Sequence, residues 1–425
     1  LPTETLKNTI RVLTLNDLIL MGLANIVGAG IFVIIGKSTK YGGNKTLLGI
    51  LMMAIISMIV GFCYIEIYSR FQSNITEYLS VRHAMGDTAG QIMIMLTYFL
   101  AIFSAVTMVI ANSKYITSFG YLSKFKDSKL VQKSLSLLLL CTMSFINYLG
   151  INASKFAAKT IATSMVLILG GIVILSRNHI NLESFPDVPP VPWDSFILSS
   201  VLSLFLFNGY DFLVKISDES IDPENNKTAL IASISITTLI YIAIIVSSIC
   251  VIGFKQSCSA HGITKMYEVL VNNRASHIVY GVASFIMFNA TFLTLLSSTR
   301  FIHGLGKDNR IPFSEFWSQN NSFNSPVNAI YVSLIIAVML AIINNEVIMA
   351  VLSNISCILI LLMLSVTVLI LRYNERDDEK AQVEHNYIKG NINNIPVLVV
   401  INITVLLYIS YIMVKNKFWI SKIYT

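Results

Sequence analysis

The sequence contains little charge. Of its 425 residues only 12% are charged, whereas soluble domains carry about 25%, and 55% are apolar, with a mean hydropathy of +0.70. Such a chain cannot hide its apolar surface from water, which excludes an ordinary soluble protein. The net charge of +7 comes from basic residues scattered between the apolar runs, a pattern that suits anionic lipid headgroups and not nucleic acid.

Patterns typical of metal sites and hydrolases are also missing. The five cysteines and six histidines are dispersed, and neither Cys-x-x-Cys nor His-x-x-x-His occurs. We therefore predict no metal site, no cofactor and no disulfide framework. There is no Gly-x-Ser-x-Gly sequence and no histidine paired with a serine or an acid inside an apolar run, so a membrane-embedded enzyme is not favoured.

The apolar residues form long runs. A helix that crosses a bilayer needs about 20 apolar residues, and eleven runs approach or exceed that length: 15–36, 47–68, 91–116, 130–149, 160–175, 196–214, 230–254, 278–302, 327–343, 347–371 and 395–414. We predict an all-α polytopic membrane protein with about eleven transmembrane helices. The first run is long and interrupted by glycines, so we expect no cleaved signal peptide. We place the N-terminus in the cytoplasm, the side toward which arginine leans, and expect the plasma membrane as the location.

The first run is interrupted in the middle of the membrane by residues 25–30, Asn-Ile-Val-Gly-Ala-Gly. Glycine weakens a helix by roughly 1 kcal/mol. If the helix unwinds here, its free N–H groups carry the positive end of the helix dipole and offer a site for a carboxylate. The alternative is that Gly28 and Gly30 only let helices pack closely, as small residues commonly do in membranes.

The sixth run contains a second interruption at residues 205–211, Phe-Leu-Phe-Asn-Gly-Tyr-Asp, followed by Lys215, Asp218 and Glu219. An ionisable group inside a membrane span costs on the order of 3 kcal/mol or more, so Asp211 indicates a functional site. The alternative is that the helix ends early and leaves Asp211 at the cytoplasmic interface.

The two interruptions lie at corresponding places in two sets of five helices. Paired, glycine-interrupted helices of this kind are typical of inverted-repeat transporters with a binding site at the midplane. We predict one membrane transport domain over residues 1–425, with repeats at 14–176 and 195–371 and an additional helix at 395–414. The repeat is inferred from hydropathy, because no residue-level similarity between the halves is visible.

At these residues the chain resembles the amino acid-polyamine-organocation superfamily of permeases, closest to its cationic and L-type amino acid transporters. The first motif matches the family's Gly-Ser/Ala-Gly-Ile-Phe in helix one, and the second resembles its Phe-x-Gly-Phe/Tyr-Asp/Glu in helix six. Residues 298–300, 306–312 and 325–329 resemble its Ser-Ser-Arg, Ala-Arg-Asp-Gly-x-x-Pro and Thr-Pro-x-x-Ala string after helix eight, except that Asn309 replaces the glycine. Three motifs in the right order make the resemblance specific.

The resemblance implies a five-plus-five inverted repeat and alternating access, with an amino acid or small amine bound between helices one and six. The N–H groups of Gly28, Ala29 and Gly30 would hold the substrate carboxylate, and carbonyls near Ile26 and Phe207 its ammonium group. Asp211 would pair with a basic side chain or take up a proton, with Phe205 and Asn208 beside it. These roles agree with the dipole argument. The acid favours a cationic or broad-range amino acid.

The coupling ion stays open. Proton-coupled members of the superfamily keep a lysine in helix five, where this chain has Met165. This difference favours an exchanger or a facilitator over a proton-coupled transporter. Sodium coupling would use the hydroxyls of Thr294, Ser297 and Ser298, although such groups in membrane helices more often bond to their own backbone. No cysteine in 114–129 supports a disulfide-linked accessory subunit, so the sequence identifies no partner protein. The superfamily commonly has twelve helices, and no twelfth is visible in this chain.

Three further interpretations remain. A sodium-coupled symporter of another small amine, a channel, or a non-transporting amino acid sensor could be built on the same broken helices. A channel would be expected to show rings of like residues along its pore, which the chain lacks. Residues 374–380 form a mixed-charge run that we interpret as a solvated loop.

Overall fold

The computed structural model describes residues 11–28, 30–117, 124–125, 127–180, 188–259, 262–375, 387–388, 391–392 and 395–415. Its helices are α1 (Leu15–Ile26), a π-helix (Gly30–Ile34), α2 (Ile35–Gly42), α3 (Thr46–Phe71), α4 (Thr76–Met85), α5 (Asp87–Thr117), α6 (Lys129–Tyr148), α7 (Ile151–Ser176), α8 (Trp193–Phe207), α9 (Phe212–Lys215), α10 (Pro223–Ser257), α11 (Gly262–Leu270), α12 (Asn273–Lys307), α13 (Ser314–Trp317), α14 (Val327–Ile343), α15 (Glu346–Asn374) and α17 (Val397–Lys415). Strands β1 (Asn391–Ile392) and β2 (Ile395–Pro396) form a small antiparallel hairpin.

The predicted class is confirmed. Within the described residues, seven helical segments are long and apolar enough to cross a membrane, and four shorter apolar helices accompany them. Each of these segments coincides with one of the predicted runs. Large apolar side chains on the outside of the bundle, such as Leu130, Leu167 and Leu239, are 75%, 70% and 68% exposed, which suits contact with lipid.

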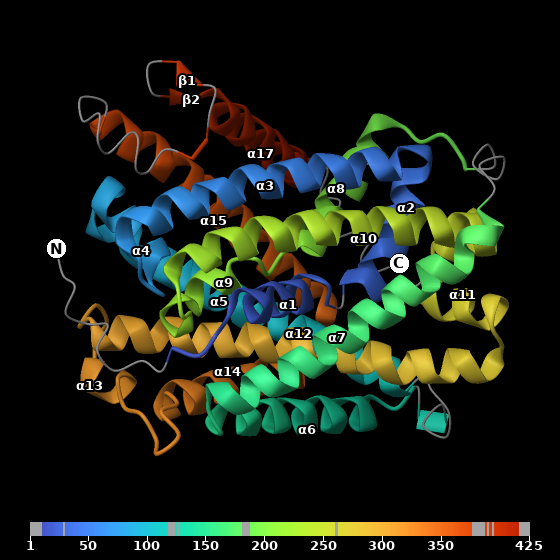
Figure 1. Ribbon diagram of the computed structural model, residues 1–425, viewed down its shortest axis with the longest axis horizontal. Helices are drawn as coiled ribbons and strands as arrows, with labels where there is room; N and C mark the ends of the chain where they lie inside the picture. Colours follow the sequence, from blue (N-terminus) through green and yellow to red (C-terminus); the bar gives the residue numbers. More distant parts are fainter. Residues whose placement is uncertain are drawn as a thin grey trace.

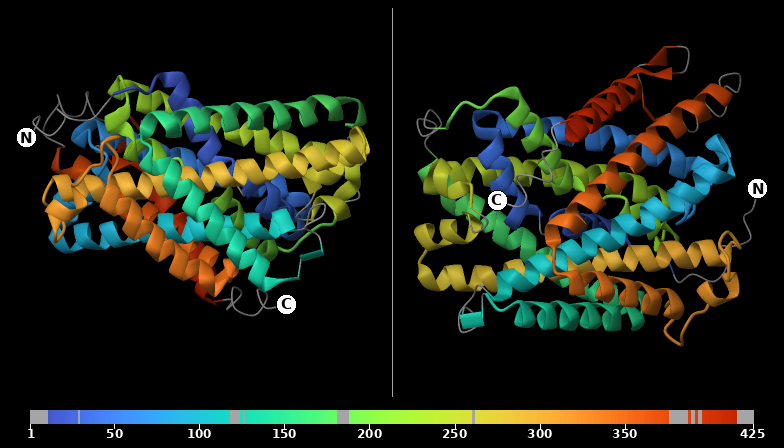
Figure 2. Two further views of the ribbon diagram at one scale, coloured as in Figure 1. Left: turned by 90° about the horizontal axis from the view of Figure 1, so that it is seen from below. Right: turned by 180° about the vertical axis from the view of Figure 1, so that it is seen from behind.

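Most of the long helices run along the longest axis of the molecule (Figure 1). α5 lies centrally and packs against both α12 and α15, whereas α17 and the hairpin lie at one edge and α6 and α14 at the other (Figures 1 and 2). We call the end that carries α4, α9 and α13 the α4 end, and the end that carries α2 and α11 the α11 end. The predicted cytoplasmic N-terminus would put the α4 end on the cytoplasmic side, which stays a prediction.

The first transmembrane helix is broken where its glycines predict. The Thr14 hydroxyl caps the start of α1 by accepting from the backbone N–H of Asp17, whose carboxylate accepts from the N–H of Thr14. α1 then stops at Ile26, and the chain resumes as a π-helix, a geometry that often marks functional sites, before α2 begins. We call residues 27, 28 and 30 the first break, because residue 29 lies outside the described residues.

The sixth transmembrane helix is broken as well. α8 ends at Phe207, Asn208 adopts an extended backbone with ψ of 139°, and Gly209 has φ of +118°, a value that glycine adopts readily and other residues rarely. One further helical turn, α9, follows. We call residues 208–211 the second break.

The broken helices lie against each other in opposite directions. α1 contacts α9, the turn after the second break, and the π-helix contacts α8, the segment before it. An antiparallel pair of this kind is what an inverted repeat requires, although the repeat itself stays a prediction. The short elements α4, α11, α13 and the hairpin were not foreseen, because none contains a run long enough to stand out in hydropathy.

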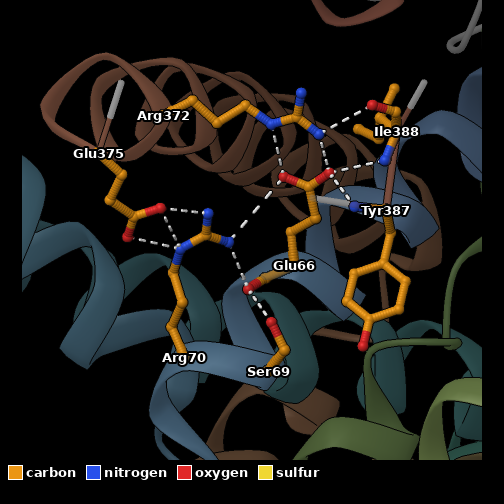
Figure 3. Close-up of polar contacts among 7 residues, drawn as sticks. All are labelled: Glu66, Ser69, Arg70, Arg372, Glu375, Tyr387 and Ile388. Carbon is orange, nitrogen blue, oxygen red and sulfur yellow. Dashed lines mark hydrogen bonds and ion pairs between the residues drawn. The ribbon is translucent and has the colours of Figure 1, made fainter. Parts of the chain in front are cut away.

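A fully buried carboxylate ties α3 to the C-terminal part of the chain at the α4 end (Figure 3). Glu66 accepts from Nε of Arg372 at 2.9 Å, forms an ion pair with its Nη2, and accepts from the backbone N–H groups of Tyr387 and Ile388 at 2.9 and 2.8 Å. Arg70 pairs with Glu375 at 2.6 Å and lies within 4.0 Å of Glu66. We call these residues the Glu66 cluster. The prediction of a solvated loop over residues 374–380 is therefore wrong at Glu375, whose carboxylate is held in an ion pair with Arg70. Residues 376–380 lie outside the described residues.

Candidate functional site

The side chain of Asn25 holds the two breaks together. Its Nδ2 donates to the carbonyl oxygen of Gly209 at 2.7 Å, and its Oδ1 accepts from the hydroxyl of Thr294 in α12 at 3.2 Å. A Cβ at Gly209 would lie 2.8 Å from Nδ2 of Asn25, so a larger residue would push this contact apart. One buried amide therefore joins α1, the second break and α12.

Tyr241 of α10 binds the opposite side of the same junction. Its hydroxyl lies 2.7 Å from the carbonyl oxygen of Leu206 and 3.2 Å from that of Ile26. Both carbonyls belong to the last turns of helices that stop at the breaks, where backbone oxygens lose their helical donors. The buried phenol therefore supplies a donor at this junction, closest to the carbonyl of Leu206, while the carbonyl of Ile26 also accepts from the N–H of Gly28.

Both glycines of the first motif are closely packed. A Cβ at Gly28 would lie 2.5 Å from Cβ of Ala290, and one at Gly30 would lie 3.0 Å from Cδ2 of Leu206. Close packing and helix interruption thus occur together, so neither interpretation excludes the other. In this conformation the N–H of Gly28 donates to the carbonyl of Ile26 at 2.9 Å, and Ala29 lies outside the described residues.

Two small cavities flank the second break. One, of about 20 Å³, lies between α1, α5 and α12 and is lined by Asn25, Leu100, Ala101, Ser104, Met108, Asn208, Gly209, Asp211, Thr294 and Ser297. The other, of about 10 Å³, lies toward α3 and α15 and is lined by Ser57, Tyr64, Leu100, Leu204, Phe207, Asn208, Tyr210, Asp211, Cys357, Ile360 and Leu361. We call them the midplane cavities. Each has room for about one water, so an amino acid enters only if the surrounding helices separate.

The predicted pocket residues are distributed unevenly around this space. Asn208 and Asp211 line both cavities and Phe207 lines one, whereas Ile26 and Phe205 are buried but absent from the described lining. Asp211 faces the cavities and is not at a surface, which favours the functional interpretation of this acid over the early helix end. Its side chain is only 16% exposed.

Asp211 does not stand alone. Its carboxylate forms an ion pair with the ammonium group of Lys215, four residues later, whose side chain is 2% exposed. Lys215 Nζ also lies 3.7 Å from Oε1 of Glu77 in α4, and this oxygen accepts from the hydroxyl of Tyr64 at 2.7 Å. We call Asp211, Lys215, Glu77 and Tyr64 the Lys215 cluster.

Comparisons with known proteins bear on this arrangement. A family model described as amino acid permease matches residues 13–424, nearly the whole chain. The chain belongs to the amino acid permease family. This confirms the resemblance to the amino acid-polyamine-organocation superfamily, and it makes the protein a membrane transporter of amino acids rather than an enzyme.

Relatives of this permease carry different names. The branched-chain amino acid permease BcaP of Bacillus subtilis is 21% identical, covering 70% of this chain and 67% of that protein. The mitochondrial cationic amino acid transporter 3 of Arabidopsis thaliana is 20% identical over 87% of this chain and 63% of its own length. A methylthioribose transporter of Bacillus subtilis is 22% identical over 87% and 84%.

The hydroxyls of the residues predicted as an alternative ion site all lie at hydrogen-bond distance from carbonyls of their own helix, α12, and that of Thr294 also contacts Oδ1 of Asn25. Thr294 donates to the carbonyl of Ala290, Ser297 to that of Thr294, and Ser298 to that of Leu295, each at 2.9 Å. These are the ordinary backbone bonds of serine and threonine in membrane helices. Their role in ion coupling stays a prediction.

The second and third motifs of this permease meet at the α4 end. Arg300 Nε donates to Oε1 of Glu219 at 2.8 Å, and both side chains are buried. They line a cavity of about 70 Å³, which we call the polar pocket, together with Ser73, Asn74, Lys215, Ile216, Asp218, His303, Gly304, Lys307, Asp308, Asn320, Asn324 and Pro326. Burial, reinforced by the neighbouring Glu219, raises the pKa of Asp218 to about 6.

Asn309 shows why one departure from the motif is tolerated. Its φ of +54° lies in the left-handed region, which asparagine adopts more readily than other non-glycine residues. The asparagine thus adopts a backbone conformation that glycine would also allow at this position of the motif.

Sequence reasoning missed several contributors to the site. Glu77 and Tyr64 lie in other helices and carry no local signal that separates them from ordinary interface and core residues. Tyr241 lies in the apolar middle of α10, where a tyrosine does not stand out. Only Lys215 had a readable signal, because residues four apart on a helix face each other.

Proposed function

We propose that this family member is a secondary transporter that exchanges amino acids by alternating access. The observation that supports this most is the antiparallel pair of broken helices whose interrupted backbones meet at Asn25 and Tyr241. Peptide groups at such breaks suit both ends of a zwitterion, since free N–H groups attract carboxylate and free carbonyls attract ammonium.

In the proposed cycle, the backbone around Gly28, Ala29 and Gly30 takes the carboxylate, and the carbonyls of Ile26 and Phe207 take the ammonium group. The N–H of Gly28 and the carbonyl of Ile26 are bonded to each other here, and Tyr241 covers the latter. Substrate binding therefore exchanges these internal bonds for bonds to the ligand. Phe205 and Asn208 then border the substrate as the helices separate.

Exchange is favoured over ion-driven transport by Met165. This buried side chain stands where proton-coupled relatives keep a lysine, and thioether sulfur does not carry a proton at physiological pH. Sodium coupling through Thr294, Ser297 and Ser298 is the competing mode. The five-plus-five repeat and a plasma-membrane location belong to the same proposal.

Two substrate classes have to be weighed: the cationic amino acid expected from the sequence, and an amino acid with a neutral side chain. The names of the relatives include both a branched-chain permease and a cationic transporter. One contact favours the neutral class: Lys215 already occupies the carboxylate that would recognise a basic side chain.

The experiment is counterflow of radiolabelled amino acids into liposomes that contain the purified full-length chain. We expect saturable uptake that internal substrate accelerates, and that persists without sodium and without a pH gradient. Uptake that requires sodium would replace exchange by sodium coupling. Conductance without saturation would identify a channel, and ligand binding without flux would identify a sensor.

A further inference from the structure

Lys215 carries a deeply buried ammonium group beside the second break. It lies on α9 directly after the second break, and its side chain is 2% exposed. It contacts two carboxylates, Asp211 and Glu77, from different helices. Burying a long charged side chain is costly unless it is paired, so a lysine at this position needs a physical reason.

The lysine lies between two spaces. Its partner Asp211 lines both midplane cavities, and Lys215 itself lines the polar pocket at the α4 end. Among the described lining residues of the midplane cavities, Asp211 is the sole carboxylate. Any substrate cation that sought an acid in these cavities would therefore meet Asp211 with the ammonium of Lys215 already on it.

The contact distances of the cluster complete the argument. The carboxylate of Asp211 pairs directly with Lys215, whereas Oε1 of Glu77 lies 3.7 Å from Nζ and accepts from the hydroxyl of Tyr64. Asp211 is therefore the acid that Lys215 occupies. A second cation placed beside this pair would be repelled by Lys215 at short range in a medium of low dielectric constant.

We propose that Lys215 is a tethered counter-ion that occupies Asp211 and thereby restricts this transporter to amino acids with neutral side chains. This inference rests on the proposed amino acid exchange and adds the substrate class. Removing the lysine while keeping Asp211 should create a site for a basic side chain.

The test compares two double variants of the full-length chain with the same change of charge. Lys215→Met with Glu77→Gln keeps Asp211, which lines the midplane cavities. Lys215→Met with Asp211→Asn keeps Glu77, which is not among their described lining residues. Each loses one lysine and one acid, so neither gains a net charge that would by itself prevent folding.

The measurement is the concentration of lysine and of norleucine that halves counterflow in proteoliposomes. The two compounds differ mainly in the terminal ammonium group, so their ratio isolates the charge. We expect norleucine to be much the better inhibitor of the wild type. In the variant that keeps Asp211 the ratio should move toward lysine by about tenfold or more, and in the variant that keeps Glu77 it should not move.

Ligand-induced thermal stabilisation in detergent supplies a second readout that needs binding but no flux. Lysine should stabilise the variant that keeps Asp211 and leave the wild type unchanged. Lys114→Met, at the ion pair with Glu346, is the matched lysine control and should keep the wild-type ratio.

A wild type that prefers lysine to norleucine would overturn the inference, as would equal ratios in the two double variants. In both cases the transport of amino acids would stand. A folded wild type that binds and exchanges no amino acid would instead remove the proposed function, and this inference with it.

Discussion

The Glu66 cluster and the Lys215 cluster are both buried groups of charges that join distant parts of the chain, yet they are built differently. Glu66 accepts two bonds from Arg372 and two from backbone N–H groups, and two arginines face two glutamates (Figure 3). In the Lys215 cluster one lysine faces two acids, its distance to Glu77 is 3.7 Å, and Oε2 of Glu77 makes no hydrogen bond to any part of the chain that the structure describes.

The difference teaches which cluster can move. A planar guanidinium bonded to both oxygens of a carboxylate fixes geometry, whereas an ammonium on a flexible stem is a single point of charge that can change partners. The Glu66 cluster also lies away from the midplane cavities, whereas Asp211 forms part of their walls. We therefore infer that the first cluster anchors the structure and the second takes part in substrate selection.

The largest effect is expected from Arg372→Met. The change leaves the buried carboxylate of Glu66 without its main partner, and breaking one side of a buried ion pair typically costs about 3–5 kcal/mol. Thermal unfolding in detergent should show a strong loss of stability. Arg82→Met, at a partly exposed pair with Asp87, is the control and should change little. Equal melting temperatures for the two variants would contradict the anchoring role.

Tyr241→Phe is expected to have an intermediate effect. It removes the hydroxyl that serves the carbonyls of Leu206 and Ile26, and buried groups left without a partner cost about 1–3 kcal/mol. Tyr98→Phe removes one contact, to Ser333, away from the breaks and provides the matched control. For Tyr241→Phe, both the melting temperature and the counterflow rate should fall. For Tyr98→Phe, the melting temperature should fall slightly and the counterflow rate should stay unchanged. A normal exchange rate in Tyr241→Phe would separate this residue from the site.

A smaller effect is expected from Asp218→Asn, and it depends on pH. Because the pKa of Asp218 is raised to about 6 in the folded chain, the folded state binds this proton more tightly than the unfolded state. Its contribution to stability is complete below about pH 4 and is lost as the pH rises through 6, so the wild type should gain up to about 1 kcal/mol between pH 7 and pH 5 from this group. The difference in melting temperature between these pH values should shrink in the variant. The exposed Asp87→Asn is the control, and an unchanged pH dependence in Asp218→Asn would refute the assignment.

The smallest change is expected from Glu77→Gln, and it tests the comparison most directly. Glutamine still accepts from Tyr64, and Lys215 keeps Asp211, so only the long contact is lost. The lost contact is offset by the removal of a buried carboxylate whose desolvation is unfavourable, so the free energy of unfolding should change by less than about 0.5 kcal/mol. Glu66→Gln is the matched control and should cost several times more, because Arg372 loses a charged partner. If both variants lose the same stability, the two clusters do not differ as we infer.

Local features of the sequence predicted most of the fold. The eleven apolar runs gave the helices, since crossing a bilayer depends on hydropathy and length alone. The glycines at 28, 30 and 209 predicted where two helices stop, because glycine acts on the backbone at its own position. Short elements such as α4 were not predicted, since they owe their form to packing against longer helices.

The candidate site was predicted only in part. Asp211, Asn208 and Phe207 line the midplane cavities, and the first two stood out in the sequence because an acid and a polar residue inside an apolar run are unusual. Their roles in substrate binding stay predictions. Phe205 and Ile26 are buried in the last turns of α8 and α1 but are not among the described lining residues, because the side on which each helix faces the cavities is set by tertiary packing. The hydrogen bonds of Asn25 and Tyr241 join residues that are far apart in the sequence, so the local sequence around each residue does not predict them.

By itself the sequence determined that this protein crosses a membrane many times, that two of its helices are interrupted, and that it carries the motifs of its family. These properties are local, because they depend on composition and on glycine at given positions. The tertiary structure alone decided which charge meets which: Arg372 on Glu66, Arg300 on Glu219, and Glu77 beside the pair of Lys215 and Asp211. Partners from different helices are fixed by packing, and only that packing distinguishes an acid that awaits a cationic substrate from one that already holds a lysine.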